Sequence, residues 1–327
     1  MVSLRQKIII VLGLTTFGTC LAQQNLEKDY PSRPVRLIVP FVAGGSMDFI
    51  GQVIGQKIAT TTGQNFYIDN RGGAGGAIGT SVVATAHPDG YTILLTSSGH
   101  AILPSISKSL SFDAIKDFAP ITLVAKSSGS VLVVHPSVPA HSVKEFIALT
   151  KNNPSKLTYG SGGIGHVAHF TAESFSLRTG VKLVHVPYRG MGQAMIDLLA
   201  GRTDAGFVSA TVLIPHIESQ KIRALAITAG TRWDKLPSVP TMDESGVKGY
   251  TYIIWYGMWF PAGTPIAYIN RIRNAVVRAL EDPVIREAFN ERGLLPVGST
   301  SQDFAKTVID EVAFHKNLVA KTGISPK

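Results

Sequence analysis

Apolar runs of strand length alternate with amphipathic segments of helix length along most of the chain. The first run, 35–39, leads through a glycine pair, Gly44 and Gly45, to Asp48. This pattern predicts a buried strand followed by a helix that Asp48 caps. Such a junction leaves backbone N–H groups unpaired at the positive end of the helix dipole, so it can bind an anion. A strand-to-helix turn that binds no ligand is the alternative explanation for the same residues.

Two further apolar runs end in polar or glycine-rich loops. The run 66–68 leads into a glycine-rich loop at 69–76, and the run 91–95 leads into 96–100, which supplies hydroxyls and a histidine. Strands that alternate with helices predict α/β layers with largely parallel sheets. Ligands bind beyond the carboxyl ends of such strands, so the three loops are expected to converge on one site.

A second set of elements begins near residue 125. The apolar runs 121–125 and 131–134 are separated by a short polar segment, which predicts a crossing into another domain. The strand 157–159 and the glycine-rich loop 160–165 then repeat the pattern of the first junction, and 222–228 is expected to be the return crossing. The expected organisation is a discontinuous first domain, residues 23–124 and 229–327, and an inserted second domain, residues 125–228.

The first 22 residues differ from the rest. Two basic residues precede an apolar segment at 8–14 and a small-residue region that ends at Ala22, the pattern of a cleavable signal peptide (1–22). The segment is shorter than the ~20 apolar residues of a membrane-spanning helix, and lipidation at Cys20 is a second alternative. Cys20 is the only cysteine, so we expect a periplasmic protein without disulfides or thiol chemistry.

Composition describes an ordinary globular chain. The 327 residues are 45% hydrophobic and 16% charged, enough for two domains with substantial cores. The net charge of +9 favours anionic partners, although Arg5 and Lys7 belong to the leader. The basic residues are scattered and show no interleaving with aromatics, so we expect no nucleic-acid partner.

Two features of the sequence bear on enzymatic function. Gly160, Gly162 and Gly165 have the GxGxxG spacing of a dinucleotide site, but the following strand does not end in the acidic residue that would hold a ribose. Neither Ser98 nor Ser161 lies in a GxSxG nucleophile elbow. Dinucleotide and hydrolase chemistry therefore have little support.

A metal site is the main enzymatic alternative. His166, His169 and Glu173 have the spacing to share one helical face. The HExxH spacing of a zinc enzyme is absent. A histidine near the ligand, a packed histidine and a solvated carboxylate explain the same residues. The alternative hypothesis is thus a secreted metal-dependent enzyme that uses this cleft.

Five stretches between Tyr30 and Asp204 occur in a characteristic order. They are YPSRP (30–34) with RLIVPFVAGGSMD (36–48), DNRGGAGGAIG (69–79), HPDGYTILLTSSGHAI (87–102), LTYGSGGIGH (157–166) with His169, and VPYRGMGQAMIDLLAGRTD (186–204). In this order the chain resembles the Bug family of periplasmic substrate-binding proteins, the receptors of tripartite tricarboxylate transporters. The resemblance extends from about Tyr30 to the C-terminus.

The resemblance implies a fold and a function. Such proteins are α/β, two-lobed periplasmic binding proteins of a type II-like class, with two α/β domains joined by crossing strands and the ligand cleft between them. It implies a receptor rather than an enzyme, which closes on a small organic acid and delivers it to the membrane permease subunits. No cofactor or metal is implied, and a monomer is expected.

The family's ligand loops can be transferred to this chain residue by residue. The glycine backbone there could hold a carboxylate without an arginine, and Ser98 and Ser161 would hydrogen-bond the ligand from opposite sides. Asp204 could orient an ammonium group or fix a turn. The expected ligand-binding residues are Ala43, Gly44, Gly45, Ser46, Met47, Gly73, Gly75, Gly76, Ser97, Ser98, His100, Ser161, Gly162, His166, Tyr188 and Asp204.

Three departures from the family pattern bear on the ligand. Met47 replaces a common threonine, Gly72-Gly73 replaces Pro-Gly, and His166 replaces a usual serine. An unpartnered buried polar group costs ~1 to 3 kcal/mol, so such changes can reverse a ligand preference. The ligand's identity therefore does not follow from the resemblance. Trp255 and Tyr256, with Trp259, could wall the cleft or pack in the core.

Overall fold

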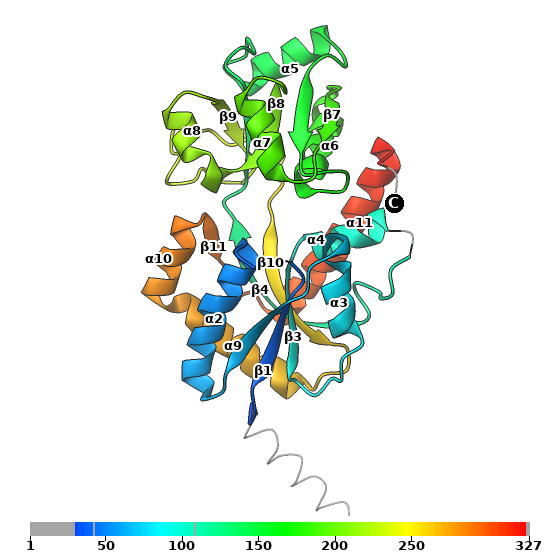
Figure 1. The fold of residues 1–327 in the computed structure, drawn as a ribbon, viewed down its shortest axis with the longest axis vertical. Helices are drawn as coiled ribbons and strands as arrows, with labels where there is room; N and C mark the ends of the chain where they lie inside the picture. Colours follow the sequence, from blue (N-terminus) through cyan, green and yellow to red (C-terminus); the bar gives the residue numbers. More distant parts are fainter. Residues whose placement is uncertain (1–29, 42, 108, 325–327) are drawn as a thin grey trace, which may run out of the picture.

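The computed structural model describes residues 30–41, 43–107 and 109–324, so the predicted signal peptide lies outside the described residues. These residues form two sheets, each in a lobe of its own (Figure 1). Within the described ranges, the helices are too short or too polar to cross a membrane. The two-lobed α/β fold expected from the sequence is confirmed.

The first lobe contains a six-stranded sheet in the order β11-β4-β10-β3-β1-β2. β1 is parallel to β2 and β3, so the loops that follow these strands leave from one sheet edge. β10 is antiparallel to β3 and β4. Because β4 leaves this lobe and β10 returns to it, the sheet is mixed rather than largely parallel. The strands are β1 (Val35–Val39), β2 (Phe66–Asn70), β3 (Thr92–Ser97), β4 (Phe118–Ser127), β10 (Trp255–Pro261) and β11 (Leu294–Pro296).

The helix α2 (Ser46–Thr62) illustrates how the sequence pattern builds these layers. Ile50, Ile54 and Ile58 are buried at a spacing of four residues, which places them on one face of the helix. The helix ends at Gly63, whose φ of +71° is the left-handed conformation that favours glycine. The other helices of this lobe are α3 (Ala77–Ala84) after the 3-10 turn η1 (Ala74–Gly76), α4 (Gly99–Ile106), α9 (Ile266–Glu281) and α10 (Pro283–Glu291).

The second lobe contains a five-stranded sheet in the order β7-β6-β8-β5-β9. β6 is parallel to β7 and β8, and β5 is antiparallel to β8 and β9. The strands are β5 (Ser130–Val134), β6 (Thr158–Ser161), β7 (Val184–Pro187), β8 (Ala205–Ser209) and β9 (Arg223–Ile227). The helices are α5 (Val143–Asn152), α6 (Val167–Thr179), α7 (Met191–Leu199), the 3-10 turn η2 (Ala210–Val212) and α8 (Ile214–Glu218).

The chain returns to the first lobe later than the sequence predicts. The run 222–228 contains β9, an edge strand of the second sheet rather than a crossing. Beyond it, Trp233 belongs to the same core cluster of the second lobe as Val131, and Met242 to the same core cluster as Phe146. Residues 229–252 therefore add to the second lobe, and β10 makes the return.

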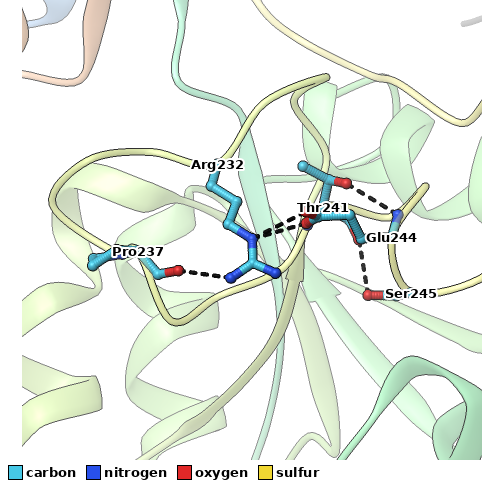
Figure 2. Close-up of polar contacts among 5 residues, drawn as sticks. All are labelled: Arg232, Pro237, Thr241, Glu244 and Ser245. Atoms are coloured by element: carbon cyan, nitrogen blue, oxygen red, sulfur yellow. Dashed lines mark hydrogen bonds and ion pairs between the residues drawn. The ribbon is translucent and has the colours of Figure 1, made fainter.

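A polar network holds part of this added segment together (Figure 2). The Nε of Arg232 lies 2.9 Å from Oε2 of Glu244, and its Nη1 donates to the carbonyl of Pro237. The same Glu244 oxygen accepts the N–H of Thr241 at 2.7 Å, and Ser245 donates to the Thr241 carbonyl. Hydrogen bonds from the Thr241 backbone and then from Arg232 lower the pKa of Glu244 below its ordinary value.

The C-terminal helix α11 (Ser301–Thr322) contacts both lobes (Figure 1, red). Near its start, Phe304 packs edge-on against Trp255 in the first lobe. Near its end, Leu318 lies in the second lobe's core and His315 meets the Phe170 ring edge-on. The sequence assigned all of 229–327 to the first domain, whereas residues 229–252 belong to the second lobe and α11 contacts both lobes.

Candidate functional site

A cavity of about 870 Å³ lies between the lobes. Its first wall comes from the loops and helices that follow β1, β2 and β3, and its second wall comes from the loop between β6 and α6. The convergence expected at the carboxyl ends of these strands is therefore present. The predicted residues that line the cavity are Ser46, Met47, Gly75, Ser97, Gly162 and His166.

In the described part of the chain, four helices begin at the cavity wall. The first N–H groups of a helix have no partner within the helix, and its dipole places partial positive charge at that end. The lining residues at these helix starts are Ser46 and Met47 of α2, Ala77 and Ile78 of α3, Gly99 of α4, and His166 and Val167 of α6. Among the described lining residues there is no lysine, arginine, aspartate or glutamate. The cavity can therefore attract an anion through backbone dipoles alone.

Left-handed glycines bring the start of α3 to the cavity. Gly75 and Gly76 have φ values of +65° and +100°, which side chains other than glycine rarely adopt. A Cβ on Gly76 would also lie 3.2 Å from the Phe41 ring. Both glycines are thus required by the turn that aims the helix start at the other lobe.

Asp48 does not cap α2, contrary to the expectation from the sequence. The helix begins at Ser46, and Gly45, three residues before Asp48, has the extended conformation of an N-cap residue. Oδ2 of Asp48 accepts the N–H of Gly44 at 3.0 Å and an N–H of the Gln52 side chain at 2.9 Å. Asp48 is therefore structural, and the N–H of Gly44 is engaged within the protein.

Ser161 is buried and bonded within its own lobe. Its Oγ lies 2.6 Å from Nε2 of His185 and accepts the N–H of Gly163 at 3.1 Å. The His185 ring stacks on His169 at a centroid distance of 4.0 Å, and Nδ1 of His169 accepts the N–H of Gly165. These contacts shape the loop on which Gly162 and His166 reach the cavity. His185 was missed because no local spacing pairs it with Ser161.

His100 lies in an aromatic cluster rather than at the cavity. It is 1% exposed, packs edge-on against Phe118, and has its Nε2 2.8 Å from the carbonyl of Ala114. Burial lowers the pKa of His100 to about 4, so its ring is neutral at physiological pH. Its side chain fixes the loop after α4 to the sheet.

Two other predicted residues have partners inside the second lobe. The Tyr188 hydroxyl donates to Asp197 at 2.7 Å. Oδ2 of Asp204 accepts both the backbone N–H and the hydroxyl of Thr158, at 2.7 and 2.8 Å. Asp204 precedes β8 beside the start of β6, at the end of the sheet away from the cavity. For Asp204 these contacts correspond to the alternative in which it fixes a turn.

The predicted residues outside the cavity lining are Ala43, Gly44, Gly45, Gly73, Gly76, Ser98, His100, Ser161, Tyr188 and Asp204.

The suggested metal ligands have other partners. His166 is the N-cap of α6, and its Nδ1 accepts the N–H of Ala168 at 3.1 Å. Burial, and then the nearby His185 and His166, lower the pKa of His169 to about 4. Glu173 accepts the Tyr159 hydroxyl at 2.8 Å. Over the described ranges, no three His, Cys, Asp or Glu side chains are grouped to hold a metal ion.

Sequence reasoning missed much of the first wall. Ile102 and Ile106 of α4 line the cavity, although their spacing resembles that of core residues. Tyr256 of β10 also lines it, whereas Trp255 and Trp259 pack in the core, so the aromatic cluster divides between the two expected roles. Burial raises the pKa of Tyr256, partly offset by a hydrogen bond with the Ser46 hydroxyl, so the phenol is neutral.

The chain has two α/β lobes that are joined by crossing strands, and helix N-termini line the cavity between them. This architecture defines a two-lobed solute-binding protein. The chain belongs to the tripartite tricarboxylate transporter family of receptors, whose model matches residues 50–324. The Bug-family resemblance is thereby confirmed. The comparisons give no support to the enzymatic alternative, because family and neighbours are binding proteins.

Similar proteins cover almost the whole chain. Protein BugT of Bordetella pertussis is 33% identical over 98% of this chain and 99% of its own length. The solved structure of Rpa4515 from R. palustris, with adipate, is 32% identical with a TM-score of 0.78, over 91% of this chain and 100% of that one. MatC from Rhodopseudomonas palustris, with bound malate, is 28% identical with a TM-score of 0.74, over 89% and 100%.

Proposed function

We propose that this protein captures an organic carboxylate in the periplasm and delivers it to the membrane permease subunits of a tripartite tricarboxylate transporter. The observation that carries the proposal is the convergence of four helix starts, within the described residues, on one cavity that no charged side chain lines. Backbone N–H groups at helix starts hold a carboxylate without a counter-ion. The adipate and malate bound by the two R. palustris proteins are carboxylates of this kind.

The proposed ligand contacts come from both lobes. Ser46, Met47 and Gly75 belong to the first lobe, and Gly162 and His166 to the second. Burial lowers the pKa of His166, so a neutral imidazole faces the ligand and adds no charge at physiological pH. Ser97 also lines the cavity, and Ser161 would support the loop that carries Gly162 and His166 from behind. We further propose that the protein acts as a monomer and is exported by a cleaved signal peptide.

The lobes already meet beside the cavity. A Cβ on Gly165 of the second lobe would lie only 2.8 Å from Cδ1 of Ile106 in α4. A ligand that bridges the two walls adds contacts only where the lobes are close together. Closure around the ligand is therefore part of the proposal, since binding favours the conformation in which both walls touch it.

The proposed function is tested by comparing acids with their uncharged amides in a thermal-shift assay. Adipate is expected to raise the melting temperature and adipamide is not, because helix dipoles stabilise the carboxylate and only the folded state binds it. A ligand at 100 times its Kd adds about 2.7 kcal/mol to the free energy of unfolding. An equal shift with adipamide would contradict recognition of the negative charge.

A further inference from the structure

Away from the helix starts, part of the cavity wall is aliphatic. Leu103 and Ile106 of α4 line it from the first lobe, and Ile164 lines it from the second. Ser46 and Ser97 lie at the helix-start end of the wall, near the carboxyl ends of β1 and β3, and Ser107, Ser109 and Ser111 line it from the segment after α4. The helix-start end of the cavity is thus suited to a carboxylate, and the aliphatic part of the wall to an apolar surface.

Two isoleucines are solvent-exposed on opposite walls. Ile78, the second residue of α3, is 53% exposed, and Ile164, in the loop before α6, is 47% exposed. Both line the same cavity, one from each lobe. An apolar ligand body between them would remove both side chains from water, and burial of apolar surface favours binding. A hydroxylated ligand would instead lose hydration there without gaining hydrogen bonds.

The size of the cavity and the charge of its lining also favour an acid with an apolar body. Its volume of about 870 Å³ lies in the upper part of the range for small-molecule sites. Among the residues described, no lysine or arginine side chain lines it, so the helix starts are where a carboxylate can be held. Ser81, which also lines the wall, donates its hydroxyl to the carbonyl of Ile78, so this donor is engaged within α3.

We infer that the ligand is an acid with a bulky apolar body, aromatic or branched aliphatic, rather than a hydroxylated di- or tricarboxylate. This inference rests on the proposed function, since the carboxylate is held at the helix starts. The apolar body lies between Ile78 and Ile164 and is covered on its sides by Leu103 and Ile106. The two isoleucines then determine specificity by contact with the part of the ligand that carries no charge.

The test is a calorimetric panel on the full mature chain. Its apolar acids are 3-phenylpropionate, benzoate, cyclohexanecarboxylate and hexanoate, and its hydroxylated acids are malate and citrate. At least one apolar acid is expected to bind tenfold or more tightly than malate and citrate, because apolar contact is gained without burying hydroxyls. Tighter binding of malate or citrate than of all four apolar acids would overturn this inference and leave the proposed function standing. Absence of binding by all six acids, together with no thermal shift from adipate, would overturn both.

Variants of the two isoleucines test the contact itself. Ile78→Ser and Ile164→Ser are each expected to weaken binding of the best apolar acid about tenfold, because each removes apolar contact with its body. Both side chains are about half exposed, so the melting temperature without ligand should change little. Ile196→Ser on α7 is the matched control, since Ile196 is 62% exposed and does not line the cavity. Wild-type affinity in both test variants would overturn the inference.

Discussion

Met47→Asp is expected to weaken carboxylate binding about 100-fold and to leave the protein folded. Met47 is the second residue of α2 and lines the cavity. Two like charges ~4 Å apart repel by about 4 kcal/mol at an effective dielectric constant of 20, so a 100-fold loss, about 2.7 kcal/mol, is a moderate expectation. An aspartate in the first turn favours the helix dipole, so α2 itself should remain stable. Calorimetric titration with the acid that raises the melting temperature most measures the loss.

Two control variants isolate the cause of that loss. Met47→Asn has the shape of the aspartate without its charge, and its affinity should fall far less. Ile266→Asp places the same charge at the start of α9, where the side chain is 66% exposed and outside the cavity, and binding should be unchanged. Equal losses in Met47→Asp and Met47→Asn would show that the acid does not lie near the start of α2.

Gly257→Ala is expected to destabilise the protein by about 3 kcal/mol, near the upper end of the usual cost of overpacking. A Cβ on Gly257 of β10 would lie 2.0 Å from Cζ of Phe304, the α11 residue that packs on this strand. The Phe304 ring is held between Trp255 and Trp259, at centroid distances of 5.5 and 4.6 Å, so it has little room to move. Urea unfolding monitored by circular dichroism measures the change.

Gly192→Ala in α7 is the matched control for that variant. A Cβ on Gly192 would meet no atom within 4 Å, and alanine favours a helix over glycine by about 0.5 to 1 kcal/mol. Its unfolding midpoint should therefore be unchanged or raised. A stability of Gly257→Ala equal to wild type would mean that α11 does not pack tightly against β10.

The sequence contained enough information to predict the cavity's position because local rules govern it. Apolar runs that end in glycines specify where strands stop and helices begin, and parallel strands bring those ends together. Ser46 and Gly75 in the first lobe and Gly162 in the second were identified in this way and line the cavity. The N-cap of α2 is Gly45, only three residues before the predicted cap at Asp48.

Long-range contacts explain what could not be predicted. Ser161 is engaged by His185, 24 residues away, and only the pairing of β6 with β7 brings the two together. The edge strand β9 and a crossing strand have the same apolar pattern, so the predicted end of the second domain at residue 228 is too early in the chain. Ile106 lines the cavity, but the apolar spacing of its helix is that of a helix packed in a core. Only the position of the second lobe distinguishes a cavity-lining residue from a core residue here.

The most direct test is a crystal structure of the protein with the acid that raises its melting temperature most. We expect the carboxylate oxygens within about 3 Å of backbone nitrogens in the first turns of at least two of α2, α3, α4 and α6. We expect no lysine or arginine side chain at that distance, since none lines the cavity among the described residues. A carboxylate held by a basic side chain, or bound outside the cavity, would contradict recognition by helix dipoles.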